Sequence, residues 1–355
     1  MANGDTTASK LGAINSGADR RALFLKVFSG EVLTTYLGAT QMLDKHMVRT
    51  ITSGKSAQFP VIGNASAKYH TPGMNIADSG NSLLSDVKHQ EKVIAIDGLC
   101  LSAVFISNIE EMMNHYDVRA EYSRQMGYAL ASHFDKSVTN TVVAAARTSS
   151  PNITSLTGSG GATLGGGQKF LGSATPTQAN LIDAIFQCAA TLDKKDVPAE
   201  DRYVMLRPTE YYGLISAAGS SSWLASSDWN SPADARKGVV YEIAGMKVIK
   251  STFLPSTDLS ASGSSLQSDA AISSDNDVFG ANGVGYGGNF STTYGLVFHK
   301  GAAGTVKLQD LAVESEYQIE RQGTLMIAKQ AIGHGILRPE CAIELRNASG
   351  TDVNM

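Results

Sequence analysis

The sequence predicts an α+β protein organised around one long helix. Apolar side chains recur at three- and four-residue steps through residues 107–147 with no proline, which predicts an amphipathic helix about 60 Å long at roughly 1.5 Å per residue. Residues 294–347 instead carry successive stretches typical of β-strands. Residues 178–254 alternate short helical and strand patterns, which indicates a compact α+β unit.

Length, charge and cysteine content narrow the classes of function. A chain of 355 residues is long enough for two domain-sized units. Its 29 basic and 33 acidic side chains give a net charge of −4, so contact with nucleic acid is expected to be local and weak, and no membrane partner is expected. No signal-peptide pattern starts the chain, and the three scattered cysteines favour reduced, buried thiols, so a soluble, non-secreted protein is expected.

The N-terminal segment is expected to act as an arm. Residues 1–19 are small and polar, and residues 20–37 alternate apolar clusters with charges, which suits a short helix or an extended arm on another surface. We expect Arg20, Arg21 and Lys26 to pair with carboxylates on a neighbouring surface, with contact to nucleic acid as the alternative.

A long β-hairpin is predicted after the arm. Residues 55–63 and 92–99 are rich in β-branched side chains and bounded by Gly or Pro. As two hairpin arms they reach about 25 to 30 Å at roughly 3.3 Å per residue. The stretch between them, residues 64–91, has few large apolar groups and two turn signals, so we expect it to dock on another subunit.

The long helix is predicted to begin with a capping box formed by Ser107 and Glu110. Its apolar stripe is expected to face the core, and Gly127 is either a point where the helix bends or a glycine that packing requires. The opposite face is charged, with side chains spaced for ion pairs of a few tenths of a kcal/mol each. The apolar stripe comprises Ile109, Met112, Met113, Tyr116, Leu130, Phe134, Val138, Val142 and Ala145, and the charged face carries Glu111, His115, Arg119, Glu121 and Arg124.

After this helix, the Ser/Thr/Gly tract at residues 148–177 predicts a flexible surface insertion. A helix is expected over 178–193, with Leu181, Ile185, Cys188 and Leu192 on one face. Then follow a strand and short helix across Pro208, two strands turning at Gly245, and a second Ser/Gly-rich loop at 256–289. The apolar faces of the C-terminal strands are expected to pack on the long helix.

Three motifs that suggest a binding site lack the neighbouring residues or secondary structure that such a site needs. Gly54-Lys55-Ser56 lacks the first glycine of a phosphate-binding loop, and the spacing of Gly283, Gly285 and Gly288 has neither a strand before it nor a helix after it. Asp275 and Asp277 belong to no complete calcium loop. No catalytic, cofactor-binding or metal-binding residues are therefore predicted, and the organisation favours a protein that binds copies of itself.

Several stretches resemble the major capsid proteins of T-seven-like, short-tailed, double-stranded-DNA bacteriophages. The similarity lies in order along both ends of the chain. It is carried by RALFLKVFSGEVL (21–33), HMVRTITSGKSAQFPVIG (46–63), KVIAIDGL (92–99), MNHYDVRAEYSRQ (113–125), GTVKLQDLAVESE (304–316) and IAKQAIGHGILRPE (327–340).

This resemblance implies the HK-ninety-seven-type capsid fold and a division of the chain into four parts. The expected parts are an N-terminal arm (1–50), an extended loop (51–99), a peripheral domain with the spine helix (100–175 and 300–355) and an axial domain (176–299). The implied function is a structural protein that assembles as hexamers and pentamers into an icosahedral head around the phage genome. A bacterial, encapsulin-like nanocompartment shell of the same fold is the alternative.

The resemblance also implies partners and a place of assembly. A scaffolding protein and a portal are expected to take part in assembly in the host bacterial cytoplasm, and the shell is expected to expand as DNA is packaged. We expect the extended loop to lie over a neighbouring copy through exposed ion pairs. The candidates on the loop are Lys55, Lys68, Asp78, Asp86, Lys88 and Lys92, and those on the neighbour are Glu110, Glu111, Arg119 and Arg124.

Overall fold

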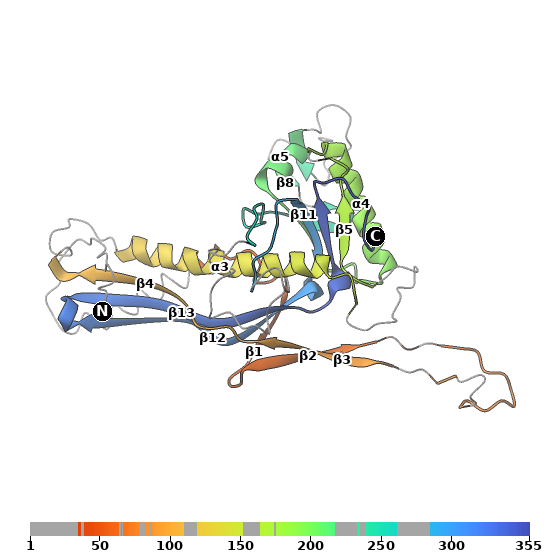
Figure 1. Ribbon diagram of the computed structural model, residues 1–355, viewed down its shortest axis with the longest axis horizontal. Coiled ribbons are helices and arrows are strands. Elements are labelled where there is room, and N and C mark those ends of the chain that lie inside the picture. The colour runs from red at the N-terminus through yellow and green to blue at the C-terminus, as the bar shows by residue number, and fades with distance from the viewer. Residues whose placement is uncertain are drawn as a thin grey trace.

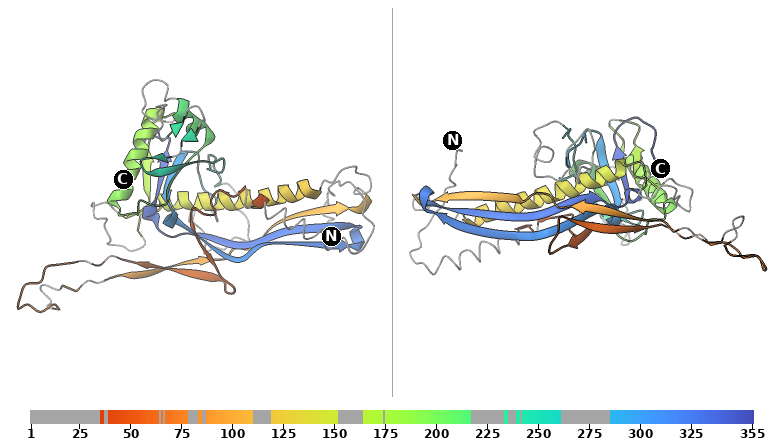
Figure 2. Two further views of the ribbon diagram at one scale, coloured as in Figure 1. Left: turned by 180° about the vertical axis from the view of Figure 1, so that it is seen from behind. Right: turned by 60° about the horizontal axis from the view of Figure 1, so that its bottom comes forward.

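Helix α3 (Arg119–Arg147) forms the axis on which two β-sheets meet in the computed structural model of the chain (Figure 1). Its N-terminal half lies along a long, narrow sheet, and its C-terminal end enters the part of the molecule that holds the second sheet and the other helices (Figure 2). The structure describes residues 35–36, 39–63, 65, 67–77, 83–84, 87–109, 119–151, 164–173, 175–216, 233–234, 239–240, 242–260 and 285–355.

The long sheet has four strands in the order β1-β12-β13-β4. β12 and β13 pair antiparallel along almost their whole length, β1 runs parallel to the start of β12, and β4 runs antiparallel to β13. The bounds are β1 Met47–Thr50, β12 Ala303–Gln318, β13 Gly323–Ile336 and β4 Cys100–Ser107.

The second sheet has six strands in the order β5-β14-β11-β6-β10-β9. Its strands are β5 Gly167–Phe170, β14 Ala342–Arg346, β11 Thr293–His299, β6 Arg202–Leu206, β10 Met246–Lys250 and β9 Glu242–Ile243. The remaining elements are β2 Ser56–Ile62, β3 His89–Ala95, α4 Gln178–Lys194, α5 Pro208–Ser216, β7 Ala233–Asp234, β8 Val239–Val240, and the short helices η5 Lys300–Ala302, η6 Ile319–Arg321 and η7 Pro339–Cys341.

Helix α4 follows directly from its sequence pattern. The side chain of Thr177 accepts a hydrogen bond from the Asn180 backbone N–H at 3.4 Å, which satisfies one unpaired donor of the first turn. The predicted apolar face, Leu181, Ile185, Cys188 and Leu192, is buried in the main core. Strand β6 is buried on both faces because it lies in the middle of the six-stranded sheet.

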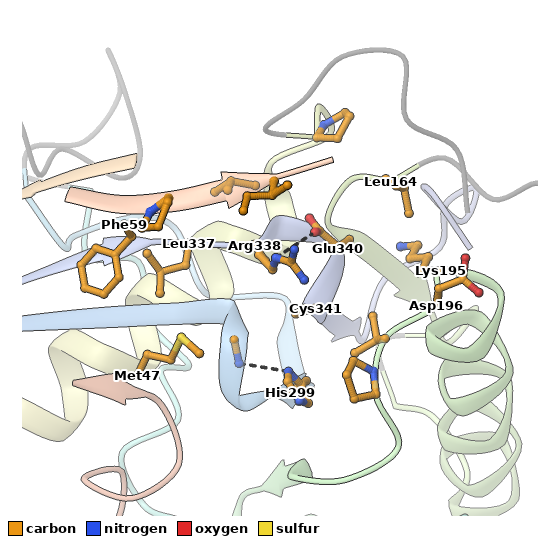
Figure 3. A pocket seen from close by; sticks show the side chains of 17 residues that line it. Met47, Phe59, Leu164, Lys195, Asp196, His299, Leu337, Arg338, Glu340 and Cys341 are labelled. Atoms are coloured by element: carbon orange, nitrogen blue, oxygen red, sulfur yellow. Dashed lines mark hydrogen bonds and ion pairs between the residues drawn. The ribbon is translucent and has the colours of Figure 1, made fainter. Parts of the chain in front are cut away.

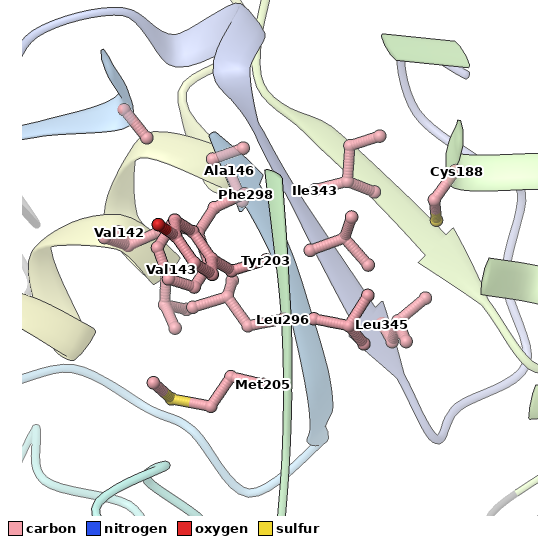
Figure 4. Packing of buried hydrophobic residues seen from close by; sticks show 14 of the residues in the cluster. Val142, Val143, Ala146, Cys188, Tyr203, Met205, Leu296, Phe298, Ile343 and Leu345 are labelled. Atoms are coloured by element: carbon pink, nitrogen blue, oxygen red, sulfur yellow. The ribbon is translucent and has the colours of Figure 1, made fainter. Parts of the chain in front are cut away.

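The C-terminal half of α3 is buried on every side. Residues 137–146 are all buried, although Ser137, Thr139, Asn140 and Thr141 are polar, and three of their hydroxyls bond back to helix carbonyls. Val142, Val143 and Ala146 lie beside Leu296 and Phe298 of β11 (Figure 4). Burying each large aliphatic or aromatic side chain stabilises the fold by about 1.5–3 kcal/mol. The predicted packing of the C-terminal strands on the long helix is confirmed.

The start of the long helix differs from the prediction. Ser107, the predicted N-cap, is the last residue of strand β4, a strand that the sequence analysis did not identify. Asn108 and Ile109 are helical, α3 is described from Arg119, and residues 110–118 lie outside the described part of the chain. The helix continues through Gly127, and Glu121 and Arg124 form the expected ion pair at 2.6 Å.

The prediction that residues 148–177 form a flexible insertion is wrong for the segment that the structure describes. Gly167–Phe170 is strand β5, parallel to β14, and Lys169 pairs with Asp352 at 2.5 Å. Gly166 lies so close to the last turn of α3 that an added Cβ would collide with the Ala145 carbonyl oxygen. The glycines here permit close packing, a use that composition does not distinguish from flexibility.

The predicted hairpin of β2 and β3 and the turn at Gly245 between β9 and β10 are present. The second hairpin strand, predicted at 92–99, instead runs from His89 to Ala95. The second Ser/Gly-rich stretch is described only at its ends, and Tyr286 near its C-terminal end is fully buried. The four-part division of the chain stays a prediction. Strands β5 and β14, which that division places in the peripheral domain, pair in one sheet with β11 and β6.

A buried ion pair fastens α3 to the six-stranded sheet. Arg147 donates from Nε and Nη2 to the two carboxylate oxygens of Glu344 at 2.8 and 2.7 Å, and Glu344 is fully buried. Thr293 also donates to Glu344 at 2.5 Å, and Arg147 donates to the Asn289 carbonyl at 2.7 Å. The carboxylate is therefore fully partnered where water does not reach it.

Truncating Arg147→Ala should lower the free energy of unfolding by about 3–5 kcal/mol, because it leaves Glu344 charged and unpaired in the core. Urea denaturation of the unassembled protein measures this. Arg124→Ala on the same helix is the control, since its exposed pair contributes at most about 0.5 kcal/mol. The double variant Arg147→Met/Glu344→Leu should regain most of the loss, and equal stabilities of Arg147→Ala and Arg124→Ala would contradict this role.

Candidate assembly interface

The hairpin of β2 and β3 projects from the body of the molecule. Its strands pair in register from Ser56 with Ala95 at the base to Ile62 with His89 at the outer end. Ala57, Ile94 and Ala95 at the base and Val61 near the outer end are buried, whereas most other side chains of the two strands are exposed. In both figures the chain beyond Ile62 reaches far past the body (Figures 1 and 2).

Four predicted contact lysines lie along this projection. Lys55 lies directly before β2, Lys92 is within β3, and Lys68 and Lys88 lie in the outer segment. Lys55, Lys68 and Lys88 are exposed, and Lys92 is half-buried. They therefore form a row of positive charge along the hairpin.

The outer end of the hairpin and the described start of α3 lie at opposite ends of the long axis of the molecule (Figure 1). Within one chain, the outer segment of the hairpin therefore does not reach the described start of α3. Arg124 is exposed and pairs with Glu121. Asp78, Asp86, Glu110, Glu111, Arg20, Arg21 and Lys26 lie outside the described residues, and for Arg119 only the backbone is described.

Large apolar side chains on the outer hairpin segment are a feature that the sequence argument did not identify. Tyr69 is fully exposed, and Ile76 and Leu84 are 53% and 64% exposed. Met74 and Ile62 are exposed as well. Isolated large apolar residues between turn signals were the available sign, and the single chain leaves these side chains exposed to solvent.

The segment before β1 is held to the spine by a buried carboxylate. Asp135 of α3 accepts hydrogen bonds from the backbone N–H groups of Gln41 and Met42 at 2.7 and 3.1 Å. Burial raises the pKa of Asp135 to about 6, and these two hydrogen bonds oppose that shift. Tyr36 packs edge-on against Phe134 of the same helix, so the segment meets α3 through both polar and apolar contacts.

Two buried histidines link the segment before β1 to the four-stranded sheet. His46 Nδ1 lies 2.6 Å from the Met42 carbonyl, which only accepts, so Nδ1 carries the proton and Nε2 accepts from Thr305 Oγ1 at 2.8 Å. Thr305 Oγ1 then accepts from His334 Nδ1 at 2.8 Å. Both imidazoles are neutral in this chain of hydrogen bonds.

Burial lowers the pKa of His46 to about 4 and lowers that of His334 well below its usual value. The charge on Lys307 acts in the same direction on both rings. The neutral pair is therefore maintained over the whole physiological range.

A pocket of about 490 Å³ lies between the outer half of β2 and the body (Figure 3). Lys195 at its edge donates from Nζ to the Gly165 carbonyl at 2.9 Å, and burial lowers its pKa to about 8. Burial raises the pKa of the Cys341 thiol to about 12, so it stays protonated. These groups form no nucleophile and base pair.

Lys55, the residue of the incomplete phosphate-loop motif, lies on an exposed turn that leads into β2. Among the described residues, no group of three or more His, Cys, Asp or Glu side chains is arranged to hold a metal ion. No described helix is long and apolar enough to cross a membrane.

Comparisons with known proteins give a consistent result. Residues 58–346 match the family described as Gp10A-like, major capsid protein. The major capsid protein of Escherichia phage T7 is 37% identical, with 93% of each chain covered, and that of Enterobacteria phage T3 is 36% identical, with 96% of this chain and 97% of the relative covered. The solved capsid structure of Cyanophage P-SCSP1u is similar with a TM-score of 0.71 and 38% identity, covering 88% of this chain and 89% of that one.

Acid should weaken the junction between the spine and the segment before β1. His46 and His334 bind protons more weakly in the folded protein than in the unfolded chain, so the unfolded chain takes up more protons below about pH 6.5. The free energy of unfolding therefore falls as the pH falls toward 4, by on the order of 3 kcal/mol from His46. Asp135 acts in the opposite sense between about pH 6 and 3.8, because its raised pKa lets the folded protein take up the proton first. Its effect, roughly 3 kcal/mol, offsets that of His46, so the net fall comes from His334.

Thermal denaturation of the unassembled protein between pH 4 and 8 measures this dependence. The variant His46→Gln should be less stable at pH 8 but should lose less stability on acidification than the unsubstituted protein. His70→Gln, in the exposed outer hairpin, is the control and should leave the slope unchanged. Parallel pH profiles for the unsubstituted protein and His46→Gln would show that His46 does not carry the effect.

Proposed function

Because this chain belongs to the Gp10A-like major capsid protein family, we propose that its projecting hairpin and spine helix are the surfaces through which copies join into a shell. The protein is a structural phage protein of the virion capsid, it forms icosahedral capsids, and its fold is the HK-ninety-seven-type capsid fold. The encapsulin-like alternative is not favoured, since relatives at 36–38% identity are phage capsid proteins.

The single observation that carries the proposed contact is the projecting hairpin itself. A two-stranded ribbon with exposed apolar and basic side chains has no core of its own and is marginally stable alone. Laid over a neighbouring copy, it buries Tyr69, Ile76 and Leu84 and brings its lysines to acidic groups near the start of the neighbour's spine. Such a contact joins two different faces, so it closes into rings or continues into a shell.

We propose the same contact residues and domain bounds that the sequence predicts. The hairpin side comprises Lys55, Lys68, Asp78, Asp86, Lys88 and Lys92, and the spine side comprises Glu110, Glu111, Arg119 and Arg124. Arg20, Arg21 and Lys26 are proposed to tie the arm to a neighbour. In this division the arm spans 1–50, the extended loop 51–99, the peripheral domain 100–175 with 300–355, and the axial domain 176–299, and the units of assembly are hexamers and pentamers.

We further propose the partners that assembly needs. A scaffolding protein and a portal take part in the host bacterial cytoplasm, and the shell encloses double-stranded DNA with which it makes weak, local contact, as a net charge of −4 supports. We propose no membrane partner, and membership of a structural family supports the proposal that the chain is not an enzyme.

Electron microscopy of the protein expressed alone and with a candidate scaffolding protein tests the proposed route of assembly. We expect closed shells whose uniformity and yield increase with the scaffold. Uniform shells in equal yield without it would contradict a scaffold requirement. Small discrete oligomers under both conditions would contradict the proposed self-assembly of the hairpin and spine.

A charge exchange tests the proposed pairing of the hairpin with the spine. Lys68→Glu should leave folding unchanged, because the side chain is exposed, but should reduce the yield of shells. Each exposed pair contributes at most about 1 kcal/mol, and repetition over many copies makes the loss visible. Adding Glu111→Lys should restore part of the yield, because every copy then carries the exchanged charges.

Lys247→Glu is the matched control, since Lys247 is exposed on β10, away from both surfaces. Shell yield by sedimentation and electron microscopy is the measurement, with a denaturation curve for each unassembled variant. An unaltered yield for Lys68→Glu, or a loss equal to that of Lys247→Glu, would rule out this lysine as a contact.

A further inference from the structure

The hairpin packs on the body through a small apolar cluster with Val306 and Leu337, and Ile94 is the most deeply buried hairpin side chain in it. Ile94 of β3 is buried against Gly304 of β12 and Gly335 of β13. A Cβ added at Gly335 would lie 2.8 Å from Ile94 Cγ1, and one added at Gly304 would lie 3.1 Å from Ile94 Cδ1. Because they lack side chains, the two glycines form a notch into which the Ile94 side chain fits. This contact is non-directional, so it does not by itself set the angle between β3 and the body.

A buried tyrosine supplies the directional part of the attachment. Tyr286 donates its hydroxyl proton to Asp97 Oδ2 at 2.5 Å, and the same hydroxyl accepts from the His334 backbone N–H at 2.9 Å. Its carbonyl accepts from Asn140 Nδ2 of α3 at 2.9 Å, and its ring packs edge-on against the His334 ring with centroids 5.4 Å apart. Tyr286 thus joins the spine, the long sheet and the chain that leaves β3.

Asp97 lies two residues beyond the end of β3, so it is the point where the hairpin passes into the body. Its backbone N–H donates to the Ile332 carbonyl of β13 at 3.1 Å, and the N–H of Ile96 donates to the Lys55 carbonyl at 2.8 Å. A hydrogen bond from a rigidly held phenol to this carboxylate therefore restricts the angle at which both hairpin strands leave the body.

Farther along β2, Phe59 packs against the cluster that contains Val306 and Leu337, and Val61 is buried. A pocket of about 490 Å³ lies beside this part of the strand, lined by Pro60 and Ile62 of β2 and by Lys195, His299 and Glu340 of the body (Figure 3). The pocket leaves β2 room to move when a contact at the base is lost.

We propose that Tyr286 is a positioning residue for assembly: its bond to Asp97 sets the angle of the hairpin, with Ile94 in the Gly304 and Gly335 notch as the pivot. This inference rests on the proposed role of the hairpin in joining copies. A small angular error at the base becomes a large displacement at Tyr69 and Ile76, because the hairpin is long. The residue therefore controls how uniformly successive copies are placed, although it touches no neighbour itself.

The first test uses hydrogen exchange on the unassembled protein. Tyr286→Phe keeps the ring and removes the hydroxyl, so the amides of Ile96 and Asp97 and of the β2–β3 base should exchange about five- to tenfold faster, the effect of losing one hydrogen bond. Amides of β6 and β11 should be unaffected. Tyr203→Phe is the matched control, because Tyr203 is a buried tyrosine whose hydroxyl lies 3.4 Å from a carboxylate oxygen of Asp201, away from the hairpin.

Variants of Asp97 keep the test decisive if Tyr286→Phe folds poorly. Asp97→Ala should reproduce the faster exchange, whereas Asp97→Asn should stay near the unsubstituted protein because its side-chain oxygen still accepts from Tyr286. The double variant Tyr286→Phe/Asp97→Ala should exchange no faster than Asp97→Ala, as expected of two groups that act through one bond. Unchanged exchange at the hairpin base in both single variants would overturn the proposed restriction.

The second test is the shape of the assembled product. Electron microscopy should show a broad range of sizes and open or aberrant shells for Tyr286→Phe and Asp97→Ala, and uniform shells for Tyr203→Phe and Asp97→Asn. Faster exchange with shells as uniform as those of Tyr203→Phe would overturn the role in assembly. Failure of the unsubstituted protein to form shells would instead contradict the proposed function, while the exchange measurements still decide whether Tyr286 holds the hairpin.

Discussion

The structure depends on the burial of the C-terminal half of helix α3 on all its sides. A helix surrounded in this way needs neighbours from several directions, and strands of both sheets supply them from segments far apart in the chain. Strand β5 is the next described strand after the helix, whereas β11 and β14 come from the last fifth of the sequence. The two sheets are thereby held against one helix. At the C-terminal end of that helix, the charges of Arg147 and Glu344 neutralise each other.

The main hydrophobic core surrounds only the C-terminal half of α3, and the elements beyond it have few buried side chains. The four-stranded sheet and the hairpin extend away from the core, and their outer parts expose large apolar side chains such as Tyr69 and Ile319. A single chain of this shape does not cover these surfaces, and the proposed contacts between copies would bury part of them. The fold of one chain thus leaves large apolar side chains exposed to solvent.

Polar groups buried between the helix and the long sheet fix the position of the segment before β1. The chain of hydrogen bonds from His334 through Thr305 to His46 and Met42 joins two strands to the segment before β1, and Asp135 holds the same segment from the helix. Apolar packing alone tolerates small shifts, whereas a buried donor that loses its acceptor costs about 1–3 kcal/mol. Such networks therefore fix position, which a protein that repeats the same contact many times requires.

The sequence by itself determined the elements whose signals are local. The periodicity of Leu181, Ile185, Cys188 and Leu192, the turn at Gly245 and the β-branched hairpin strands each follow from neighbouring residues, and so were predicted correctly. The family was also accessible from ordered stretches of similarity. What only the tertiary structure decided are contacts between distant residues: Gly166 against the end of α3, β4 against β13, and Tyr286 against Asp97. A glycine that permits close packing has the same letter as one in a loose loop, and a lone tyrosine in a Ser/Gly-rich tract shows no period. Their roles arise from partners that the linear order does not reveal.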